Sequence, residues 1–479
     1  MNSLFTCPRP HDLLARPSPS AVVAAVMTAL VLLCGSLSAQ LPSATVVGVD
    51  ERPAQSQRPN ILLLIADDLG VDNVGAYGEH PNAARTPNID GLAAGGVMFR
   101  NAWSNQTCSP SRSTLLTGRY TFRTGLGRAI TYAGTGFELG LDESTLPQAL
   151  YPAGYRSAAV GKWHMAGEFL SGAQHPLLLG FEHHRGPMDN LPGPNGGTDY
   201  WDYDKAVDGV ITRSRTYATT DQVDDALDLM ASFGPQPWFL WLAFSAPHSP
   251  FHAPPAELHS YDLPPNVGAN IPIYMHAMTE AMDSEIGRLL ASMPPAVLAN
   301  TIVIFVADNG TAGVATDAPF DPNHAKATLY EGGVNVPLIV SGPGVARGAE
   351  CGALVNLTDI TAAIAELAGA DTSFASDGVS IVPYFDDPAL PSLRSWVYSQ
   401  RFAPVGFLPV YAADRRTARD ERFKLLINFD NAPTPTAFEL FDLAVDPFET
   451  ADLLLGSLTP SQQAAHDALL GTMQALQGW

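Results

Sequence analysis

The stretch Ile61-Leu62-Leu63-Leu64-Ile65-Ala66-Asp67-Asp68 decides the fold class of this 479-residue chain. Six apolar residues in a row predict a strand that is buried on both faces, and the carboxylates of Asp67 and Asp68 mark its end. Continuous apolar strands are typical of parallel sheets that helices cover on both sides. We therefore expect an α/β fold with a polar pair at one edge of its sheet.

Polar residues also end three further apolar runs of the chain. Helical patterns occupy residues 221–233 and 273–292 between these runs, and strands that alternate with helices predict an α/β sandwich. Ligands of such sheets bind outside the carboxyl ends of the strands, so we expect the polar residues to form one site. The runs are 155–160, 238–244 and 301–307, and they lead into Lys162 and His164, into His248, and into Asp308 and Asn309.

The sequence pattern changes after about residue 385. We expect a large mixed, mainly parallel sheet sandwiched by helices in a catalytic domain of residues 59–385. A small C-terminal α+β subdomain of residues 386–479 would carry a short antiparallel sheet. The segments that predict this subdomain are strand-like at 395–399, 423–428 and 439–443 and helical at 460–477.

The first 39 residues predict a secretory signal peptide. Arg9 and Arg16 precede an apolar stretch at 21–34, and small residues follow it up to a cleavage point near Ala39. The apolar stretch is short for a membrane span, and a retained anchor is the alternative. We expect an exported protein, periplasmic or extracellular, without a stable membrane span in the mature chain. Residues 40–58 would form a flexible lead-in.

Charge and cysteine content narrow the functional classes. Without its first 39 residues the chain has 24 basic and 47 acidic residues, and such a surface repels nucleic acid. We expect no nucleic-acid partner. Cys108 and Cys351 are the cysteines that remain after cleavage, and an exported protein with two cysteines can form one disulfide. If Cys108 is catalytic, Cys351 has no partner.

The segment Cys108-Ser109-Pro110-Ser111-Arg112 predicts a reactive position at the start of a helix. Pro is favoured in the first turn of a helix, where free N–H groups favour an anion, and Arg112 lies one turn beyond Cys108. An inert core cysteine is one alternative. A thiolate phosphatase is another, but its phosphate loop is longer and rich in glycine, and Pro110 has no N–H to donate.

Asp67, Asp68, Asp308 and Asn309 offer oxygen ligands only. Such a set suits a hard cation, Ca²⁺ or also Mg²⁺, rather than zinc. A single Asp pair at a strand end also forms turns, but two pairs at the ends of two neighbouring strands favour a metal site.

Lys162, His164, His248 and Lys326 are the second polar group. Taken singly, each has an explanation without a functional role: a lysine on the surface or a histidine satisfied in the core. With a cation and Arg112, the lysines would hold a tetrahedral oxyanion and neutralise charge as it builds on a leaving oxygen.

Together these segments resemble the formylglycine-dependent (type I) sulfatases of the alkaline phosphatase superfamily. Cys-x-Pro-x-Arg at Cys108 is the signature at which sulfatases carry formylglycine. The resemblance spans residues 59–450 and implies an alkaline phosphatase-like fold. It also implies that a formylglycine-generating enzyme oxidises Cys108 to an aldehyde during maturation, a covalent change that the sequence itself does not show. The segments that match are 58–70, 108–119, 154–164, 247–248, 307–310 and 326–337.

The family mechanism assigns a role to each matching residue. The aldehyde at position 108 hydrates to a diol, and one hydroxyl, activated by the cation, attacks the sulfur of a sulfate ester. The resemblance gives the cation ligands as Asp67, Asp68, Cys108 in its modified form, Asp308 and Asn309. Arg112 and Lys162 would hold the diol, His248 and Lys326 would bind sulfate and assist departure of the alcohol, and His164 would deprotonate the second hydroxyl.

Two other functions remain open beside sulfate ester hydrolysis. One is a phosphomonoester or phosphonate hydrolase of the same superfamily, and the other is a catalytically silent binding homologue. The expected substrate is a sulfated glycan or a small aryl sulfate. Residues 165–220 would form the variable wall of the pocket, with His184 and Arg185 as candidate substrate contacts, although they could equally be part of a packed surface loop.

Overall fold

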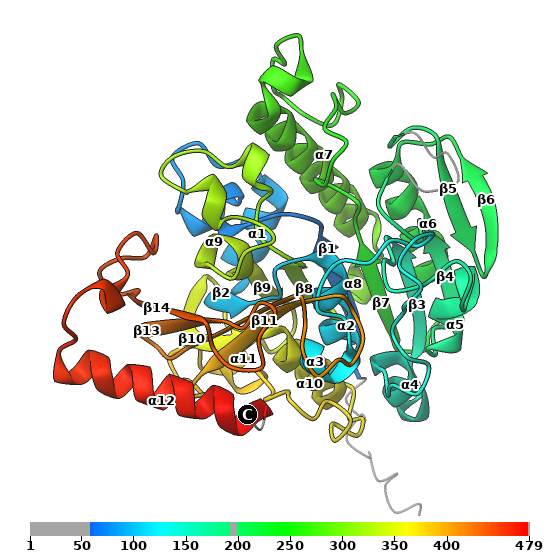
Figure 1. Cartoon of the computed structure of the whole chain (residues 1–479). Helices are drawn as coiled ribbons and strands as arrows, with labels where there is room; N and C mark the ends of the chain where they lie inside the picture. The colour runs from blue at the N-terminus through cyan, green and yellow to red at the C-terminus, as the bar shows by residue number, and fades with distance from the viewer. Residues whose placement is uncertain (1–57, 192–198, 478–479) are drawn as a thin grey trace, which may run out of the picture. The chain divides into compact units, whose positions relative to one another are not determined.

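The computed structural model describes residues 58–191 and 199–477. The signal peptide expected at 1–39 and the lead-in expected at 40–58, apart from Arg58, lie outside the described residues. Within the described residues, ten strands form one sheet in the order β10-β2-β9-β8-β1-β7-β3-β4-β5-β6 (Figure 1). These strands are β1 (Asn60–Ala66), β2 (Gly96–Trp103), β3 (Arg156–Gly161), β4 (His183–Gly186), β5 (Tyr203–Val207), β6 (Val210–Ser214), β7 (Trp238–Ala243), β8 (Thr301–Ala307), β9 (Leu338–Ser341) and β10 (Ala349–Asn356).

The strand β1 lies at the centre of this sheet because its side chains are apolar on both faces. It pairs in parallel with β7 on one side and with β8 on the other. Every residue from Ile61 to Ala66 has no exposed surface. β3 and β4 continue the parallel pairing, whereas β5, β6 and β9 run antiparallel to their neighbours. The predicted mixed, mainly parallel sheet is therefore confirmed.

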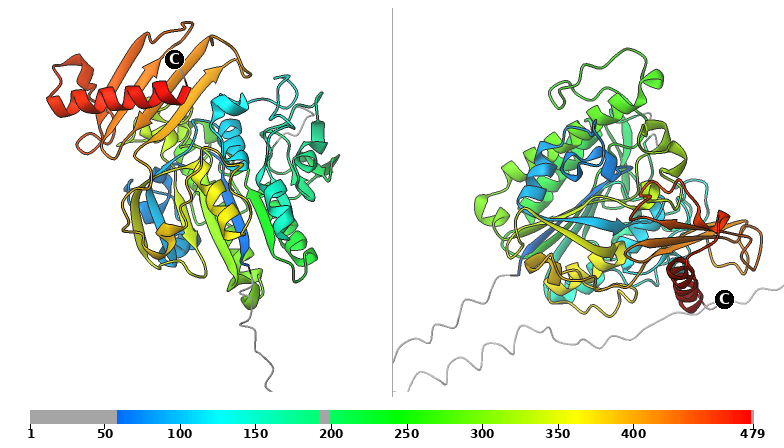
Figure 2. Two further views of the ribbon diagram at one scale, coloured as in Figure 1. Left: turned by 90° about the horizontal axis from the view of Figure 1, so that it is seen from below. Right: turned by 90° about the vertical axis from the view of Figure 1, so that its left-hand side faces the viewer.

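Helices cover both faces of the large sheet (Figure 2). α6 and α7 pack against each other and α1 packs on α7, whereas α2 packs on α10. The methionines Met275, Met278 and Met282 of α7 lie in the core, as expected of flexible apolar fillers. The helices are α1 (Pro87–Ala94), α2 (Cys108–Thr117), α3 (Thr121–Thr124), α4 (Leu146–Leu150), α5 (His175–Leu178), α6 (Ala218–Ser232), α7 (Ile271–Ser292), α8 (Pro295–Leu298), α9 (Glu331–Val334), α10 (Leu357–Leu367), α11 (Pro383–Asp386) and α12 (Pro460–Gln477).

A four-stranded antiparallel sheet follows in the C-terminal part of the chain, as predicted. Its order is β11 (Val397–Ala403), β12 (Ala413–Arg419), β13 (Phe423–Asn428) and β14 (Ala437–Asp442). α12 packs on it, and the two share a hydrophobic cluster that includes Leu425, Leu469 and Tyr120. The strand β12 was not expected because its sequence is mostly polar and charged. The boundary at 385/386 stays a prediction.

The segment 165–220 was expected to form the variable wall of the pocket, or else a packed surface loop. Its described part contains α5 and the strands β4, β5 and β6, which extend the large sheet. None of the helices in the described part of the chain is long and apolar enough to cross a bilayer.

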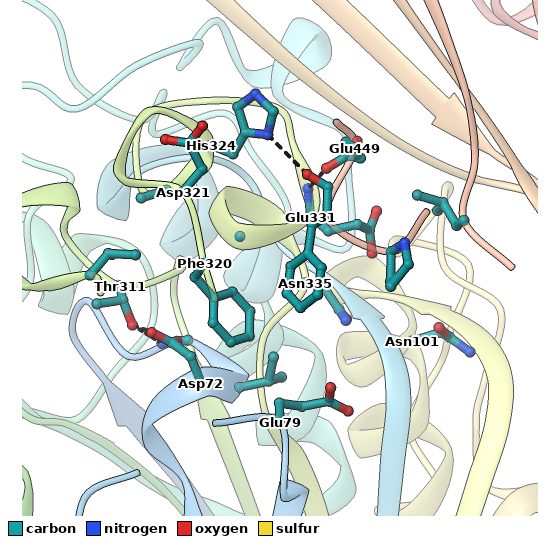
Figure 3. A pocket seen from close by; sticks show the side chains of 18 of the residues that line it. Asp72, Glu79, Asn101, Thr311, Phe320, Asp321, His324, Glu331, Asn335 and Glu449 are labelled. Carbon is teal, nitrogen blue, oxygen red and sulfur yellow. Dashed lines mark hydrogen bonds between the residues drawn. The ribbon is translucent and has the colours of Figure 1, made fainter. Parts of the chain in front are cut away.

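A buried charge network joins the C-terminal sheet to the catalytic part of the chain. Lys424 of β13 has no exposed side-chain surface, and its Nζ lies 3.1 Å from Glu331 Oε1 and 2.8 Å from Glu449 Oε1. Arg419 of β12 lies 3.1 Å from Glu331 Oε2. Glu331 and Glu449 also line a cavity of about 250 Å³ together with Asp72 (Figure 3). Side chains of both sheets line this cavity, Arg100 of β2 and Arg419 of β12 among them, so it lies at the junction between the sheets.

Replacement of Lys424 by Met should destabilise the fold strongly. The variant leaves two buried carboxylates with one cation, and loss of one partner of a buried ion pair costs about 3–5 kcal/mol. Urea unfolding measures the free energy of unfolding. Arg422→Met is the control, because Arg422 pairs with Asp442 from a largely exposed position; it should cost far less. Equal losses in the two variants would contradict a structural role for the buried network.

Candidate active site

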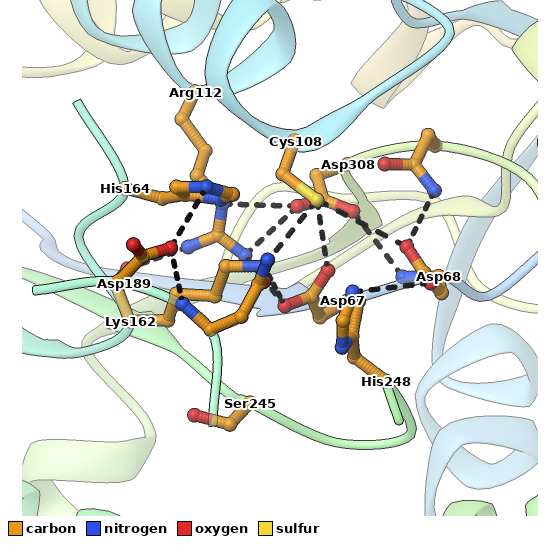
Figure 4. Close-up of polar contacts among 12 residues, drawn as sticks. Asp67, Asp68, Cys108, Arg112, Lys162, His164, Asp189, Ser245, His248 and Asp308 are labelled. Atoms are coloured by element: carbon orange, nitrogen blue, oxygen red, sulfur yellow. Dashed lines mark hydrogen bonds and ion pairs between the residues drawn. The ribbon is translucent and has the colours of Figure 1, made fainter. Parts of the chain in front are cut away.

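The two acidic pairs meet because β1 and β8 are neighbouring parallel strands. Ala66 and Ala307 are paired in register, so Asp67 and Asp308 follow at the same edge (Figure 4). The N–H of Asp308 donates to the carbonyl of Ala66 (3.0 Å), and the N–H of Asp68 donates to Asp308 Oδ1 (3.3 Å). Asp67, Asp68, Asp308 and Asn309 are all buried. The pattern of strand ends thus predicted a real convergence of side chains.

Cys108 lies beside this acidic group as the first residue of α2, which confirms the expected helix start. Its Sγ is 3.3 Å from Asp67 Oδ1 and 4.0 Å from Asp68 Oδ1. Two ammonium groups approach the same sulfur, Lys162 Nζ at 3.3 Å and Lys326 Nζ at 3.8 Å. The residue at position 108 therefore lies between carboxylates and cations.

Three cations neutralise three carboxylates around Cys108. Arg112 Nε donates to Asp308 Oδ2 at 2.9 Å. Lys326 Nζ lies 2.5 Å from Asp68 Oδ1, and Lys162 Nζ pairs with Asp67 Oδ2. Such close pairing is required because an unpaired buried charge is costly.

The ionisation of these groups follows from burial and from their partners. Burial disfavours the Asp67 carboxylate, but the charges of Lys162, His248, Arg112 and Lys326 together hold its pKa well below the ordinary value. Burial and the neighbouring Asp67 raise the pKa of Asp308 to about 6.

The Cys108 thiol is held in its neutral form. Burial and the charges of Asp308 and Asp67 raise its pKa. A cysteine nucleophile reacts as the thiolate and needs a lowered pKa. These surroundings therefore argue against Cys108 as a thiolate nucleophile. Cys351 is also a free thiol, as expected if Cys108 is not in a disulfide.

The acidic group fits a hard divalent cation. Asp67, Asp68, Cys108 and His248 each present a ligand atom, and these atoms lie within 4.8 Å of one another. Among the described residues, Asn309 Oδ1 is buried without a hydrogen-bond partner, while its Nδ2 donates to Asp68 Oδ1 (2.8 Å). A buried carbonyl oxygen without a donor beside carboxylates is a donor set for Ca²⁺ or Mg²⁺.

The two predicted histidines flank the charged cluster. His248 Nε2 is 3.7 Å from Asp68 Oδ2. His164 is buried, and its Nε2 faces both the carbonyl of Ile130 (2.6 Å) and Asp189 Oδ1 (3.2 Å). Nε2 therefore carries the proton, and Nδ1 is left without a partner. Burial and the nearby Lys162 and Arg112 lower the pKa of His164, which keeps Nδ1 free to accept a proton.

Asp189 is a site residue that the sequence reasoning missed. Its carboxylate contacts His164 and also accepts the N–H of Tyr132 (2.7 Å). It lies in a polar segment without an apolar strand before it, so the strand-end pattern offered no signal. Only the tertiary contact with His164 reveals it.

The predicted substrate contacts His184 and Arg185 have other partners. The His184 ring is fully buried and packs edge-on against Trp163. Arg185 Nη1 pairs with Asp228 (2.6 Å) and Asp225 (3.4 Å) of α6. Both belong to β4, inside the packed sheet, and among the described residues neither contacts the Cys108 cluster.

Comparison with known proteins identifies the family of this chain. The sulfatase family model matches residues 59–370, and the model of the N-sulphoglucosamine sulphohydrolase C-terminal region matches residues 322–474. The chain therefore belongs to the sulfatase family, and the resemblance noted in the sequence is confirmed.

Individual relatives share this family. Pig (Sus scrofa) N-acetylgalactosamine-6-sulfatase is 32% identical over 71% of this chain and 68% of its own length. Human (Homo sapiens) arylsulfatase A is 28% identical over 84% of this chain and 85% of its own. Mouse (Mus musculus) arylsulfatase J is 32% identical over 68% of this chain, which spans only 54% of that relative.

Solved structures give the same fold. Ps i-CgsB in complex with k-i-k-neocarrahexaose superposes with a TM-score of 0.74 at 25% identity, over 88% of this chain and 93% of that chain. BT4656 in complex with D-glucosamine-2-N,6-O-disulfate superposes with a TM-score of 0.71 at 21% identity, over 88% and 98%.

Calcium should stabilise the folded protein through Asn309. A ligand that binds only the native state at 100 times its Kd adds about 2.7 kcal/mol to the free energy of unfolding. Thermal melting with calcium should therefore show a raised Tm that a chelator reverses. Asn309→Ala should need at least about tenfold more calcium for the same shift, since even outer ligands of a metal change affinity that much.

The matched control for this experiment is Asn335→Ala. Asn335 Oδ1 is also buried without a partner, but Asn335 lines the cavity at the sheet junction. Its calcium response should equal that of the unsubstituted protein. A response of Asn309→Ala identical to that control would show that Asn309 is not a ligand.

Proposed function

We propose that this protein hydrolyses sulfate esters to an alcohol and inorganic sulfate. The observation that carries the proposal is the position of Cys108, whose Sγ lies within 4.0 Å of Asp67, Asp68, Lys162 and Lys326. A reacting group there faces oxygen ligands on one side and ammonium groups on the other. The named sulfatase activity of the relatives supports sulfate rather than phosphate as the substrate.

The proposal includes conversion of Cys108 to formylglycine by a formylglycine-generating enzyme. The family to which the chain belongs supports this conversion. A bound Ca²⁺, or Mg²⁺, would act as a Lewis acid held by Asp67, Asp68, Asp308 and Asn309.

The side chains around position 108 have separate tasks in this proposal. Arg112 and Lys162 hold the oxygen nucleophile and keep Asp67 and Asp308 ionised beside it. Lys326 and His248 face the sulfate group and supply positive charge, or a proton, as the alcohol leaves. His164 accepts the proton of the remaining hydroxyl at Nδ1, and Asp189 fixes the tautomer that makes this possible.

We propose a sulfated carbohydrate as the substrate class. The N-acetylgalactosamine-6-sulfatases are named for a sulfated sugar, and Ps i-CgsB was solved with k-i-k-neocarrahexaose. We also propose that the protein is exported, with its predicted signal peptide removed near Ala39.

Mass spectrometry of the peptide between Arg100 and Arg112 tests the conversion of Cys108. An active preparation should carry an aldehyde or its hydrate at position 108 instead of a thiol. The Cys108→Ala variant should lose at least about 10⁴-fold in kcat, as expected for a missing nucleophile. A fully active preparation that contains only the thiol would refute the conversion.

Turnover of a chromogenic aryl sulfate and its phosphate analogue tests the choice of ester. The sulfate should be hydrolysed with the higher kcat/KM. Lys326→Met should lower kcat by about 10²–10³-fold, because it removes one donor to the developing oxyanion. Lys205→Met is the control, since Lys205 pairs with Asp221 and Asp225 instead. Higher kcat/KM for the phosphate would favour a phosphomonoesterase, and no turnover of either ester would favour a silent homologue.

A further inference from the structure

A row of side chains across the C-terminal sheet places two arginines side by side. Arg401 of β11 is directly opposite Arg415 of β12, which is opposite Asn428 of β13. Residues directly opposite each other in an antiparallel pair project from the same face, and like charges there are destabilising. Local choices that oppose stability mark functional positions in natural proteins. The stability of the fold therefore does not explain why two arginines lie opposite each other.

Arg401 lacks a carboxylate partner among the described residues. Arg415 has one, since its Nη2 lies 3.1 Å from Asp430, but Arg401 Nη1 donates only to the carbonyl of Ala327, at 3.2 Å. Arg128 is exposed and has no ion pair in the described part of the chain. Burial and the charges of Arg415 and Arg128, partly offset by Asp430, lower the pKa of Arg401. The arginines form a cationic cluster in a chain of net charge −22.

A cavity of about 260 Å³ lies against this cluster. Its walls include Arg401, Arg415 and the segment 327–330. The carboxylate of Glu439 also lines it, but that group accepts the hydroxyl of Tyr330 at 2.6 Å. One water occupies about 30 Å³ in the liquid, so the cavity has room for an oxyanion.

Backbone contacts tie the arginine cluster to the segments that carry the active site. Ala327, which Arg401 contacts, directly follows Lys326, and its N–H donates to the carbonyl of Gln106 (2.8 Å). Gln106 Nε2 donates to the carbonyl of Gly127 (2.9 Å), next to Arg128. Gln106 is two residues before Cys108. Arg401 thus contacts the loop that holds Lys326, and the backbone next to Arg128 contacts the segment before Cys108.

We propose that Arg401, with Arg128 and Arg415, binds a second oxyanion of the substrate, either a sulfate or a carboxylate. The substrate class is then a saccharide with at least two anionic groups, one hydrolysed at position 108 and one held by the arginines. Guanidinium groups suit this task because their planar N–H donors match sulfate and carboxylate oxygens. The inference rests on the proposed sulfatase function.

Competition against chromogenic aryl sulfate hydrolysis tests the proposal. Three disaccharides serve as inhibitors: one with a single sulfate, one with two sulfates, and one with a sulfate and a carboxylate. The protein should bind at least one of the two-anion disaccharides about tenfold or more tightly than the single sulfate, as expected for one charge-assisted contact. The difference between the two-anion ligands identifies sulfate or carboxylate as the preferred second group.

Arg401→Gln should abolish this preference, with the inhibition constant of the preferred two-anion ligand rising at least about tenfold more than that of the single sulfate. Arg128→Gln, at an exposed position, should give a smaller loss in the same direction even if Arg401→Gln folds poorly. Arg347→Gln is the matched control, because it removes one exposed positive charge just before β10 begins. That position lies at the amino end of a strand, whereas the Cys108 site lies at the carboxyl ends of the parallel strands. The Arg347→Gln variant should keep the preference for the two-anion disaccharide.

Two results would overturn the proposal. One is equal binding of all three disaccharides by the unsubstituted protein, and the other is an equal loss for all three in the Arg401 and Arg128 variants, which indicates a structural role. If the protein does not hydrolyse the aryl sulfate, the proposed function fails separately. Calorimetric titration of the same disaccharides into the protein and the Arg401→Gln variant then decides the second site by itself.

Discussion

The parallel pairing of β1 with β8 is the constraint on which the site depends. It puts Asp67 and Asp308 at one edge of the sheet with their backbones joined by a hydrogen bond from Asp308 to Ala66. Carboxylates so close together and so deeply buried repel one another and require cations. Arg112, Lys162 and Lys326 meet that requirement from α2, from the end of β3 and from the loop before α9. The cluster around Cys108 is therefore held together by the same electrostatics that it would use on a substrate.

This balance explains why position 108 is unusual. The three carboxylates and three cations leave the cluster neutral, and a divalent cation would make it positive enough to attract a sulfate ester. The thiol of Cys108 stays protonated in this environment, which is unsuitable for a thiolate but no obstacle to an oxygen nucleophile. The motif Cys-x-Pro-x-Arg alone predicts a reactive cysteine at position 108. The structure shows a position whose surroundings favour an uncharged side chain.

The C-terminal sheet has two roles that its sequence did not predict. Lys424 and Arg419 join it to Glu331 through buried ion pairs. On β11 and β12 it also places Arg401 opposite Arg415. The strand β12 carries many charged residues, so its hydropathy gave no sign of a strand, and only the pairing with β11 and β13 defines it. The strands within 165–220 were not predicted for a related reason, since β5 and β6 are short strands at the edge of the sheet with no long apolar run.

The sequence by itself determined the fold class and the residues at the strand ends. It could do so because a strand buried on both faces needs a continuous apolar run, and the residue that follows such a run must lie at the sheet edge. The tertiary structure alone decided which polar residues face the site. It turned His184 and Arg185 toward structural partners, brought Asp189 to His164, and left Arg401 without a carboxylate among the residues that the structure describes. Those outcomes depend on contacts between segments far apart in the chain, and no local pattern of residues encodes them.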